Sequence, residues 1–100
     1  MNSEENLKMD ALSIAKLAAK ALDDKKGKEI KLIKVEEIST LADYFVFASA
    51  NSSTQVKALA DEVEYQLKEH SILPDHIEGK NSNDWILLDY KNVIVHVFLE

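Results

Sequence analysis

The chain has 100 residues, 46 % of them hydrophobic and 30 % charged, with a formal net charge of −6 at pH 7. This composition is typical of one globular domain, which we place at residues 1–100 with residues 1–6 flexible. The absence of cysteine excludes disulfides, thiolate metal sites and cysteine nucleophiles. No apolar run reaches the roughly 18 residues of a membrane span, and the acidic N-terminus does not resemble a signal peptide. We therefore expect a cytoplasmic protein that does not associate with membranes.

Charge is unevenly distributed along the chain. Residues 1–34 contain eight Lys and six acidic residues, whereas residues 35–100 contain four Lys and twelve acidic residues. There is no Arg, the residue whose planar guanidinium binds phosphate and guanine with two hydrogen bonds. We therefore predict no sequence-specific binding of nucleic acid. The acidic second part of the chain instead favours a basic protein partner.

The first half of the chain contains one helical pattern and two strand patterns. Apolar residues at helical spacing between Leu7 and Leu22 predict an Ala-rich helix with Gly27 as its C-cap. Residues 29–35 predict a strand. The continuous apolar run YFVFASA, residues 44–50, predicts a central strand that is buried on both faces.

The second half contains one further helix and three strands. Ser52 and Gln55 form a capping-box pattern, which predicts a helix that begins within about two residues of Ser53. A short strand follows Pro74, and WILLDY–KN–VIVHVF predicts a hairpin in which Asn92 can take a positive φ. The order α-β-β-α-β-β-β predicts an α/β (α+β) fold, with two helices packed on a mixed sheet of about five strands. The expected core residues are Phe45, Val46, Phe47, Val56, Leu59, Val63 and Val95.

The histidines and serines form no recognisable catalytic or metal site. His70, His76 and His96 lack the spacing of metal ligands, and His96, between two valines, is best explained as a hydrogen-bonded structural residue. The serines lack a nucleophile elbow, and two isolated glycines cannot form a phosphate-binding loop. We predict no catalytic residue, no metal, no cofactor and no enzymatic activity.

Three short features rise above this background: Asp43-Tyr44, Trp85 and Asp89-Tyr90. Strand alternation places Trp85 and Asp89 on one face of their strand and Tyr90 on the other. A face that carries both Trp and Asp is not a simple dry core. Core packing and display at a surface are both compatible with Trp85 and Tyr90.

Three segments of the sequence resemble the ribosomal silencing factor family, also called Iojap-like. They are ALDDKKGKEI, STLADYFVFASANSSTQVKALADEV and IEGKNSNDWILLDYKNVIVHVF, and the resemblance spans about residues 11–98. It implies a nucleotidyltransferase-like fold in a protein that binds and is not an enzyme. It also implies a homodimer that binds the large ribosomal subunit through ribosomal protein fourteen. Binding there would block joining of the small subunit and repress translation.

The resemblance also implies which residues bind the partner. It assigns a contact patch to Trp85, Asp89 and Tyr90, to which we add Asp43 and Tyr44. The family usually has a Gly-Asp turn where this sequence has Lys91-Asn92. Family members also usually continue into a Leu-rich tail, which we expect to be absent here because the sequence ends at VFLE.

Two other functions remain open from the sequence. Organellar relatives of the family suggest a factor for biogenesis of the large subunit. The fold analogy alone suggests a nucleotidyltransferase-like enzyme. Such an enzyme needs clustered carboxylates for Mg²⁺, and the sequence contains no Asp-x-Asp pair.

Overall fold

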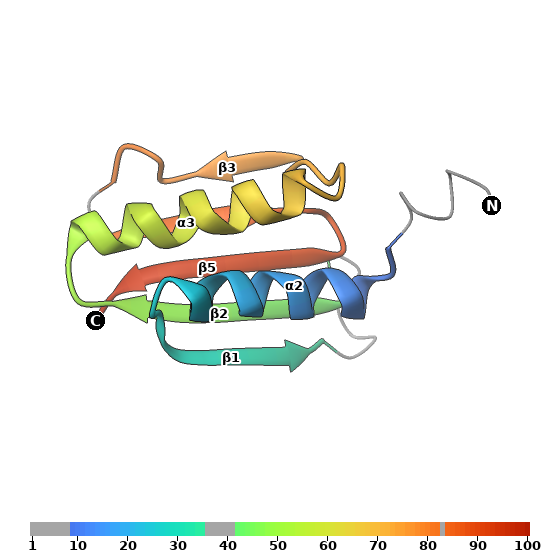
Figure 1. The fold of residues 1–100 in the computed structure, drawn as a ribbon, viewed down its shortest axis with the longest axis horizontal. Coiled ribbons are helices and arrows are strands. Elements are labelled where there is room, and N and C mark those ends of the chain that lie inside the picture. The colour runs from blue at the N-terminus through green and yellow to red at the C-terminus, as the bar shows by residue number, and fades with distance from the viewer. Residues whose placement is uncertain (1–8, 36–41, 83) are drawn as a thin grey trace.

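A computed structural model describes residues 9–35, 42–82 and 84–100 of the chain. Its two helices are α2 (Ala11–Asp24) and α3 (Ser53–Lys68). Its strands are β1 (Lys28–Lys34), β2 (Tyr44–Ala50), β3 (His76–Glu78), β4 (Trp85–Asp89) and β5 (Val93–Leu99). The order along the chain is the predicted α-β-β-α-β-β-β (Figure 1).

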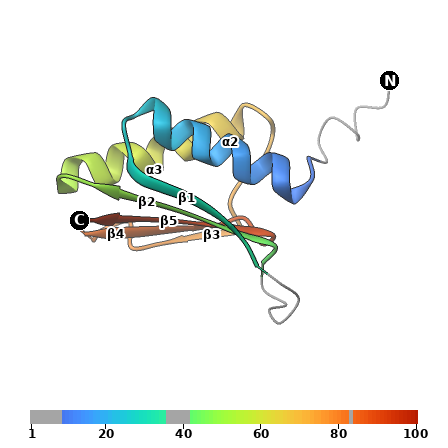
Figure 2. The same ribbon diagram turned by 90° about the horizontal axis from the view of Figure 1, so that it is seen from below.

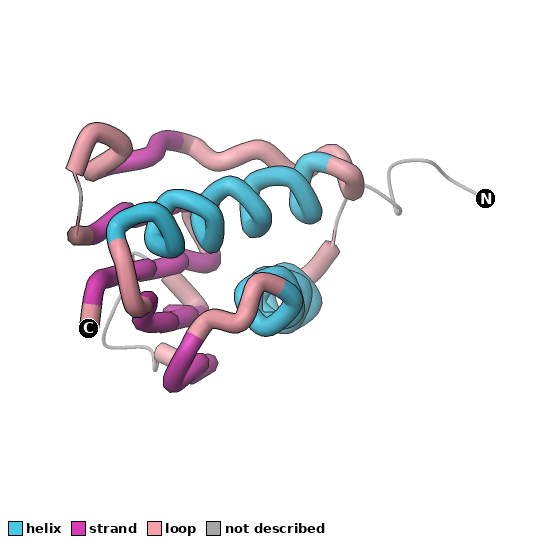
Figure 3. The backbone as a smooth tube through the Cα atoms, turned by 60° about the vertical axis from the view of Figure 1, so that its left-hand side comes forward, coloured by secondary structure: helices cyan, strands magenta, loops and turns pink. Residues whose placement is uncertain are grey.

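The five strands form one mixed sheet in the order β1-β2-β5-β4-β3. β2 and β5 are parallel, and the other neighbouring pairs are antiparallel. β1 and β3 are therefore the two edges of the sheet (Figure 3). Both helices lie on the same side of the sheet, and no described element covers the other side (Figure 2). The predicted mixed sheet with two helices is confirmed.

The core fills the space between the two helices and the covered side of the sheet. Successive strand side chains point to opposite sides, so every second residue of a strand reaches this space. The buried residues include Val46, Ala48, Ile86, Leu88, Val95 and Val97 from the sheet, and Ala15, Ala18, Leu22, Val56, Leu59, Val63 and Leu67 from the helices. The small alanines of α2 let its backbone approach the sheet closely. Val46, Val56, Leu59, Val63 and Val95 are core residues, as predicted.

The prediction that β2 is buried on both faces is wrong. β2 lies between β1 and β5 as a central strand, but Phe45 and Phe47 project to the uncovered side and are only half-buried. A continuous apolar run is typical of a strand covered by helices on both sides. Here both helices lie on the same side, so Phe45 and Phe47 are not part of the core.

The beginning of α3 follows its predicted capping box. The helix begins at Ser53, and the Ser52 hydroxyl accepts a hydrogen bond from the Gln55 backbone N–H at 3.2 Å. The Gln55 side-chain oxygen accepts a hydrogen bond from the Asn51 backbone N–H at 2.6 Å. Both interactions satisfy backbone donors at the turn that leads from β2 into α3.

The end of α2 differs from its prediction in one residue. Lys26, not Gly27, takes the left-handed conformation, with φ of 63°. The Lys26 N–H donates to the Asp23 carbonyl at 2.9 Å, and the Gly27 N–H donates to the Leu22 carbonyl at 2.8 Å. These are the two hydrogen bonds of a Schellman motif. Gly27 serves close packing instead, because a Cβ there would lie 3.1 Å from the Leu22 carbonyl oxygen.

The predicted hairpin connects β4 to β5, but the residue with positive φ in its turn is not the one that the sequence suggested. The Tyr90 N–H donates to the Val93 carbonyl at 2.8 Å, which closes a two-residue turn. Lys91 has φ of 73°, whereas Asn92 is not among the residues with positive φ. Two-residue hairpin turns need positive φ at their first central position. Lys91 therefore occupies the place that favours glycine.

The core predicts a clear contrast between two leucines. Leu59 of α3 is fully buried in the core, whereas Leu73 is 66 % exposed. Leu59→Ala should lower the free energy of unfolding by about 2–5 kcal/mol through lost burial and the cavity left behind. Leu73→Ala should change it by no more than about 0.5 kcal/mol. Urea denaturation measures both, and equal effects would contradict this assignment of the core.

Candidate partner-binding face

The uncovered side of the sheet carries a contiguous set of apolar and aromatic side chains, which we call the open face. It consists of Ile33 of β1, Phe45 and Phe47 of β2, Ile94, His96 and Phe98 of β5, and Trp85 and Leu87 of β4. Ile33, Trp85 and Phe98 are 46, 42 and 40 % exposed. Single exposed hydrophobic residues are ordinary, but a contiguous apolar patch is typical of an interaction surface.

Strand register makes the open face continuous across four strands. In one row, Ile33 pairs with Phe45, and Phe45 pairs with Ile94. In the next row, Phe47 pairs with His96, which pairs in turn with Leu87. Trp85 pairs with Phe98 in a third row. Cross-strand neighbours on one face are close enough for their side chains to touch, so the rows form one surface.

His96 lies at the centre of the open face among aromatic rings. It stacks on Phe47 with ring centroids 4.8 Å apart, and Phe45 meets it edge-on at 5.4 Å. Its Nε2 is buried and has no hydrogen-bond partner among the described residues. The prediction of a hydrogen-bonded structural residue is therefore wrong for this nitrogen. Burial lowers the pKa of His96 below its ordinary value, so at neutral pH the ring is an uncharged part of the apolar surface.

Trp85 lies at one end of the open face, as a partly exposed side chain. Gly79, with φ of +81°, lies against the ring: a Cβ there would be 3.0 Å from Trp85 Cε3 and 2.5 Å from the Trp85 carbonyl oxygen. The Ser82 hydroxyl accepts hydrogen bonds from the backbone N–H groups of Asp84, at 3.2 Å, and Trp85, at 3.4 Å. These contacts hold the start of β4 and fix the position of the Trp85 ring. Of the two arrangements that the sequence left open for Trp85, core packing and display at a surface, the structure shows a partly exposed side chain.

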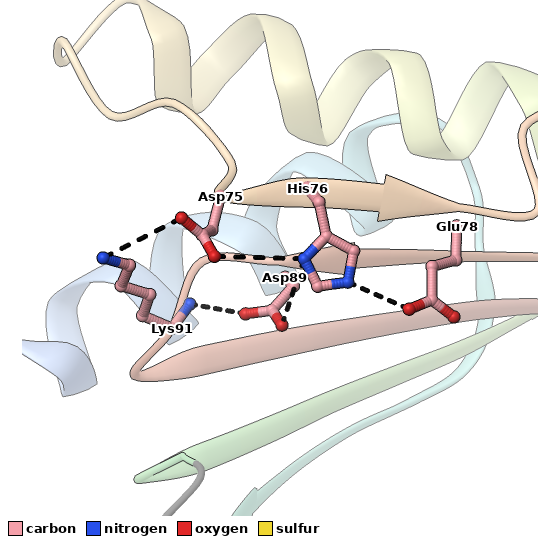
Figure 4. A network of polar contacts seen from close by, with 5 residues as sticks. All are labelled: Asp75, His76, Glu78, Asp89 and Lys91. Carbon is pink, nitrogen blue, oxygen red and sulfur yellow. Dashed lines mark hydrogen bonds and ion pairs between the residues drawn. The ribbon is translucent and has the colours of Figure 1, made fainter.

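A polar cluster adjoins the other end of the open face. It consists of Asp75, His76, Glu78, Asp89 and Lys91 (Figure 4). His76 Nε2 lies 2.9 Å from Glu78 Oε2, and its Nδ1 lies 3.6 Å from Asp89 Oδ2 and 3.9 Å from Asp75 Oδ2. The Lys91 backbone N–H donates to Asp89 Oδ1 at 2.7 Å, and Lys91 Nζ lies 3.8 Å from Asp75 Oδ1. We call these five residues the His76 cluster.

Tyr90 lies on the opposite side of the sheet from Trp85 and Asp89. Alternation along the strand carries its side chain under the helices, where it is 6 % exposed. The predicted patch of Trp85, Asp89 and Tyr90 is thus not one surface, because Tyr90 belongs to the core. The Tyr90 hydroxyl is buried and has no hydrogen-bond partner in the part of the chain that the structure describes, and this burial raises its pKa.

Asp43 and Tyr44 are also separate from Trp85. Tyr44 pairs with Val93 at the start of β5, whereas Trp85 pairs with Phe98 near its end. Five residues of strand separate the two positions, which corresponds to roughly 16 Å. The Tyr44 side chain packs against the core, and Asp43 and Tyr44 line an open recess of about 400 Å³ beside the start of α2.

The described residues show neither a grouped metal site nor a membrane-spanning helix. No three His, Asp or Glu side chains in this part of the chain are arranged to hold a metal ion. No helix there is long and apolar enough to cross a membrane. The histidine of the His76 cluster instead contacts carboxylates directly.

The sequence interpretation missed most of the open face, although one signal was present. In YFVFASA, residues 45 and 47 are large and aromatic, whereas residues 46, 48 and 50 are Val, Ala and Ala. The small residues face the helices, which approach closely, and the aromatic residues face away. This alternation in size, within a run that is uniformly apolar, marks the two sides of the strand.

Comparisons with known proteins agree with the fold and with these motifs. A family model described as "Ribosomal silencing factor during starvation" matches residues 8–100. Ribosomal silencing factor RsfS of Bacillus subtilis (strain 168) is 42 % identical over 90 residues, which are 90 % of this chain and 76 % of that protein. A crystal structure of a Chromobacterium violaceum protein superposes with a TM-score of 0.88 at 40 % identity, covering 91 % of this chain and 76 % of that one.

A more distant relative comes from an organelle. The mouse protein named "Mitochondrial assembly of ribosomal large subunit protein 1" is 29 % identical over 84 residues, which are 78 % of this chain and 36 % of that protein. The family match and the bacterial relatives together define a ribosome-associated class of protein. The chain belongs to the ribosomal silencing factor family.

Tyr90 provides a test of the covered side. Because its buried hydroxyl has no hydrogen-bond partner in residues 9–35, 42–82 and 84–100, Tyr90→Phe should leave the free energy of unfolding unchanged or raise it by about 1 kcal/mol. The matched control Tyr65→Phe, at a 58 % exposed position of α3, should have little effect. Chemical denaturation measures both variants. A loss of stability specific to Tyr90→Phe would show that the hydroxyl has a partner.

His96 should make stability sensitive to acid. The pKa of His96 in the folded protein is lowered from its ordinary value of 6.5. The contribution of the neutral ring to stability is therefore fully present above pH 6.5 and is lost as the pH falls through the lowered pKa. His96→Phe keeps an aromatic ring and removes the titrating group. The stability of this variant relative to the wild type should therefore rise as the pH decreases below about 6.5. Thermal unfolding across this range, with a constant difference at every pH, would refute the prediction.

Proposed function

We propose that this protein binds the large ribosomal subunit through ribosomal protein fourteen and blocks joining of the small subunit. The single observation that carries the proposal is the open face, on a chain that belongs to the ribosomal silencing factor family. A protein at the joining surface needs contact area and no chemistry, because steric exclusion alone represses translation. We accordingly propose a cytoplasmic binding protein with no enzymatic activity.

The residues of the open face suit protein recognition. Trp85, Phe98 and Ile33 offer exposed apolar area, and aromatic side chains are frequent anchors of protein interfaces. The strands hold these side chains by backbone pairing, so little conformational freedom is lost on binding. The His76 cluster supplies carboxylates at one end of this area, which suits a partner with basic residues.

Sedimentation of ribosomes on sucrose gradients tests this function. The protein should migrate with free large subunits and be missing from assembled ribosomes. Its addition before subunits are mixed should also reduce the yield of assembled ribosomes. Migration with assembled ribosomes would contradict the steric mechanism.

A second candidate, a factor for large-subunit assembly, is favoured by the name of the mouse relative. The two proposals differ in the particle that is bound. An assembly factor migrates with immature large subunits and leaves the mature ones. We also propose that the chain forms a homodimer. If the dimer interface includes the open face, a second copy of the chain competes with the ribosome for that surface.

Trp85→Ala separates an anchor from a core residue. As a buried anchor at the interface, Trp85 should contribute about 2–4 kcal/mol to binding, which is roughly 30- to 1,000-fold in affinity. Stability should fall far less than the roughly 3–5 kcal/mol of a core Trp, because the ring is 42 % exposed. Affinity for large subunits and thermal unfolding are measured on the same preparation.

The matched control for this substitution is Tyr65→Ala. Tyr65 is an exposed aromatic residue of α3, on the helix side of the molecule. It should bind large subunits with wild-type affinity. If Trp85→Ala also binds normally, or if Tyr65→Ala loses binding instead, the open face is not the binding surface.

A further inference from the structure

His76 occupies an unusual position on the edge strand β3. Among the described elements, β3 contacts β4 alone, so the surroundings of His76 are set by these two strands and the loops beside them. His76 pairs across the strands with Asp89. Glu78, two residues further along β3, lies on the same side and holds His76 Nε2 at 2.9 Å. The imidazole thus lies between carboxylates on both sides.

The charged groups that face His76 can be named completely for these elements. Asp75 approaches from the preceding loop, Glu78 from β3 and Asp89 from β4, while Lys91 of the hairpin turn contacts Asp75. With His76 neutral, three carboxylates and one ammonium group give the cluster a charge of −2. With His76 protonated, the charge is −1. One proton therefore halves the net charge of this cluster.

The His76 cluster is continuous with the open face. Asp89 pairs with Ile94, and Glu78 pairs with Leu87, so cluster and apolar residues are cross-strand neighbours. Asp89 is only 22 % exposed in its side chain, whereas the His76 ring is 48 % exposed. A partner that covers Leu87 and Ile94 must therefore approach the charges of the cluster closely.

We propose that His76 regulates docking at the open face, because its protonation state sets the charge that a basic partner surface meets there. The inference rests on the proposed function, in which the open face binds a ribosomal protein. A partner with Lys or Arg opposite Asp89 and Glu78 docks faster when His76 is neutral. The protonated ring is a resident cation that occupies the same carboxylates.

The direction of the pH dependence follows from the contacts of the ring. The hydrogen bond to Glu78 and the charges of Asp89, Glu78 and Asp75 outweigh desolvation and raise the pKa of His76 above 6.5. The ring therefore keeps its proton to a higher pH than an ordinary histidine and loses it as the pH rises through this raised value. Association should accelerate over the same range. Burial shifts the pKa of His96 in the opposite direction, below 6.5.

Two substitutions lock the cluster in its two charge states. His76→Gln represents the neutral ring, and His76→Lys represents the protonated one. The experiment measures association rates with isolated large subunits between about pH 5.5 and about pH 8.5, for the wild type and both variants. The matched control is His70→Gln, since His70 is an exposed histidine that follows α3 and contacts the Gln66 carbonyl oxygen, away from this cluster.

The wild type should pass from the rate of the Lys variant at low pH to the rate of the Gln variant at high pH. For one charge at an exposed site, the change should be about two- to five-fold, and it should shrink at high salt. The control should follow the wild type. NMR titration of His76 in the free protein should show the raised pKa, and Glu78→Gln should lower it.

The outcomes distinguish this inference from the proposed function. If the subunits are bound but the Gln and Lys variants keep the wild-type pH profile, the regulatory role of His76 is wrong and the binding function stands. If the wild type binds large subunits at no pH, the proposed function fails and this inference fails with it. A rate that decreases through the titration of His76 would overturn the proposed charge of the partner.

Discussion

The covering of the sheet on one side only is the constraint from which the other features of this molecule follow. Alternation in a strand sends each residue either under the helices or away from them. In many antiparallel sheets, the uncovered residues are polar, and the molecule is complete without a partner. In this protein most of the uncovered residues of β2 and β5 are instead apolar or aromatic: Phe45, Phe47, Ile94, His96 and Phe98. The open face is therefore an apolar surface in contact with water, and covering it lowers the free energy of the system.

The same constraint explains why this surface is well suited to recognition. Its side chains project from strands whose backbone groups are paired with neighbouring strands, so their positions are set before a partner arrives. His96 keeps its place by stacking on Phe47, and Trp85 keeps its place against Gly79. Rigid aromatic residues lose little conformational entropy on binding. The charges lie at the margin of the apolar centre, and in the proposed function they orient the partner there.

Much of the fold could be predicted from the sequence because its signals are local. The capping box before Ser53 and the helical spacing of both helices depend on neighbouring residues, and the structure confirms them. Positive φ was harder to assign, since Lys26 and Lys91 take the left-handed conformation beside Gly27 and Asn92, which are better suited to it. The hydrogen bonds of the helix end and of the hairpin turn decide which residue takes the left-handed conformation, and composition alone does not reveal these hydrogen bonds.

The site was predicted less completely because it depends on pairing between distant residues. Strand alternation correctly separated Trp85 and Asp89 from Tyr90. The contact patch nevertheless included Tyr90, whose side chain lies in the core. The His76 cluster requires β3 to pair with β4 in one register, so that His76 lies opposite Asp89. No spacing along the chain indicates this register. Likewise, the alternation in size along β2 distinguishes its two sides, but only the placement of both helices on one side shows that the side with Phe45 and Phe47 is uncovered.

The geometry of the surface also bears on the choice between a binding protein and an enzyme. A reaction needs polar groups that converge on one point in a cavity from which water is excluded. Here the carboxylates of the His76 cluster contact a histidine and a lysine at the margin of the sheet, and the aromatic residues are spread along three strands. Spread-out apolar area contributes to binding in proportion to what a partner covers, and a small substrate covers little of it. The protein partner that we propose offers a surface as broad as this uncovered side of the sheet.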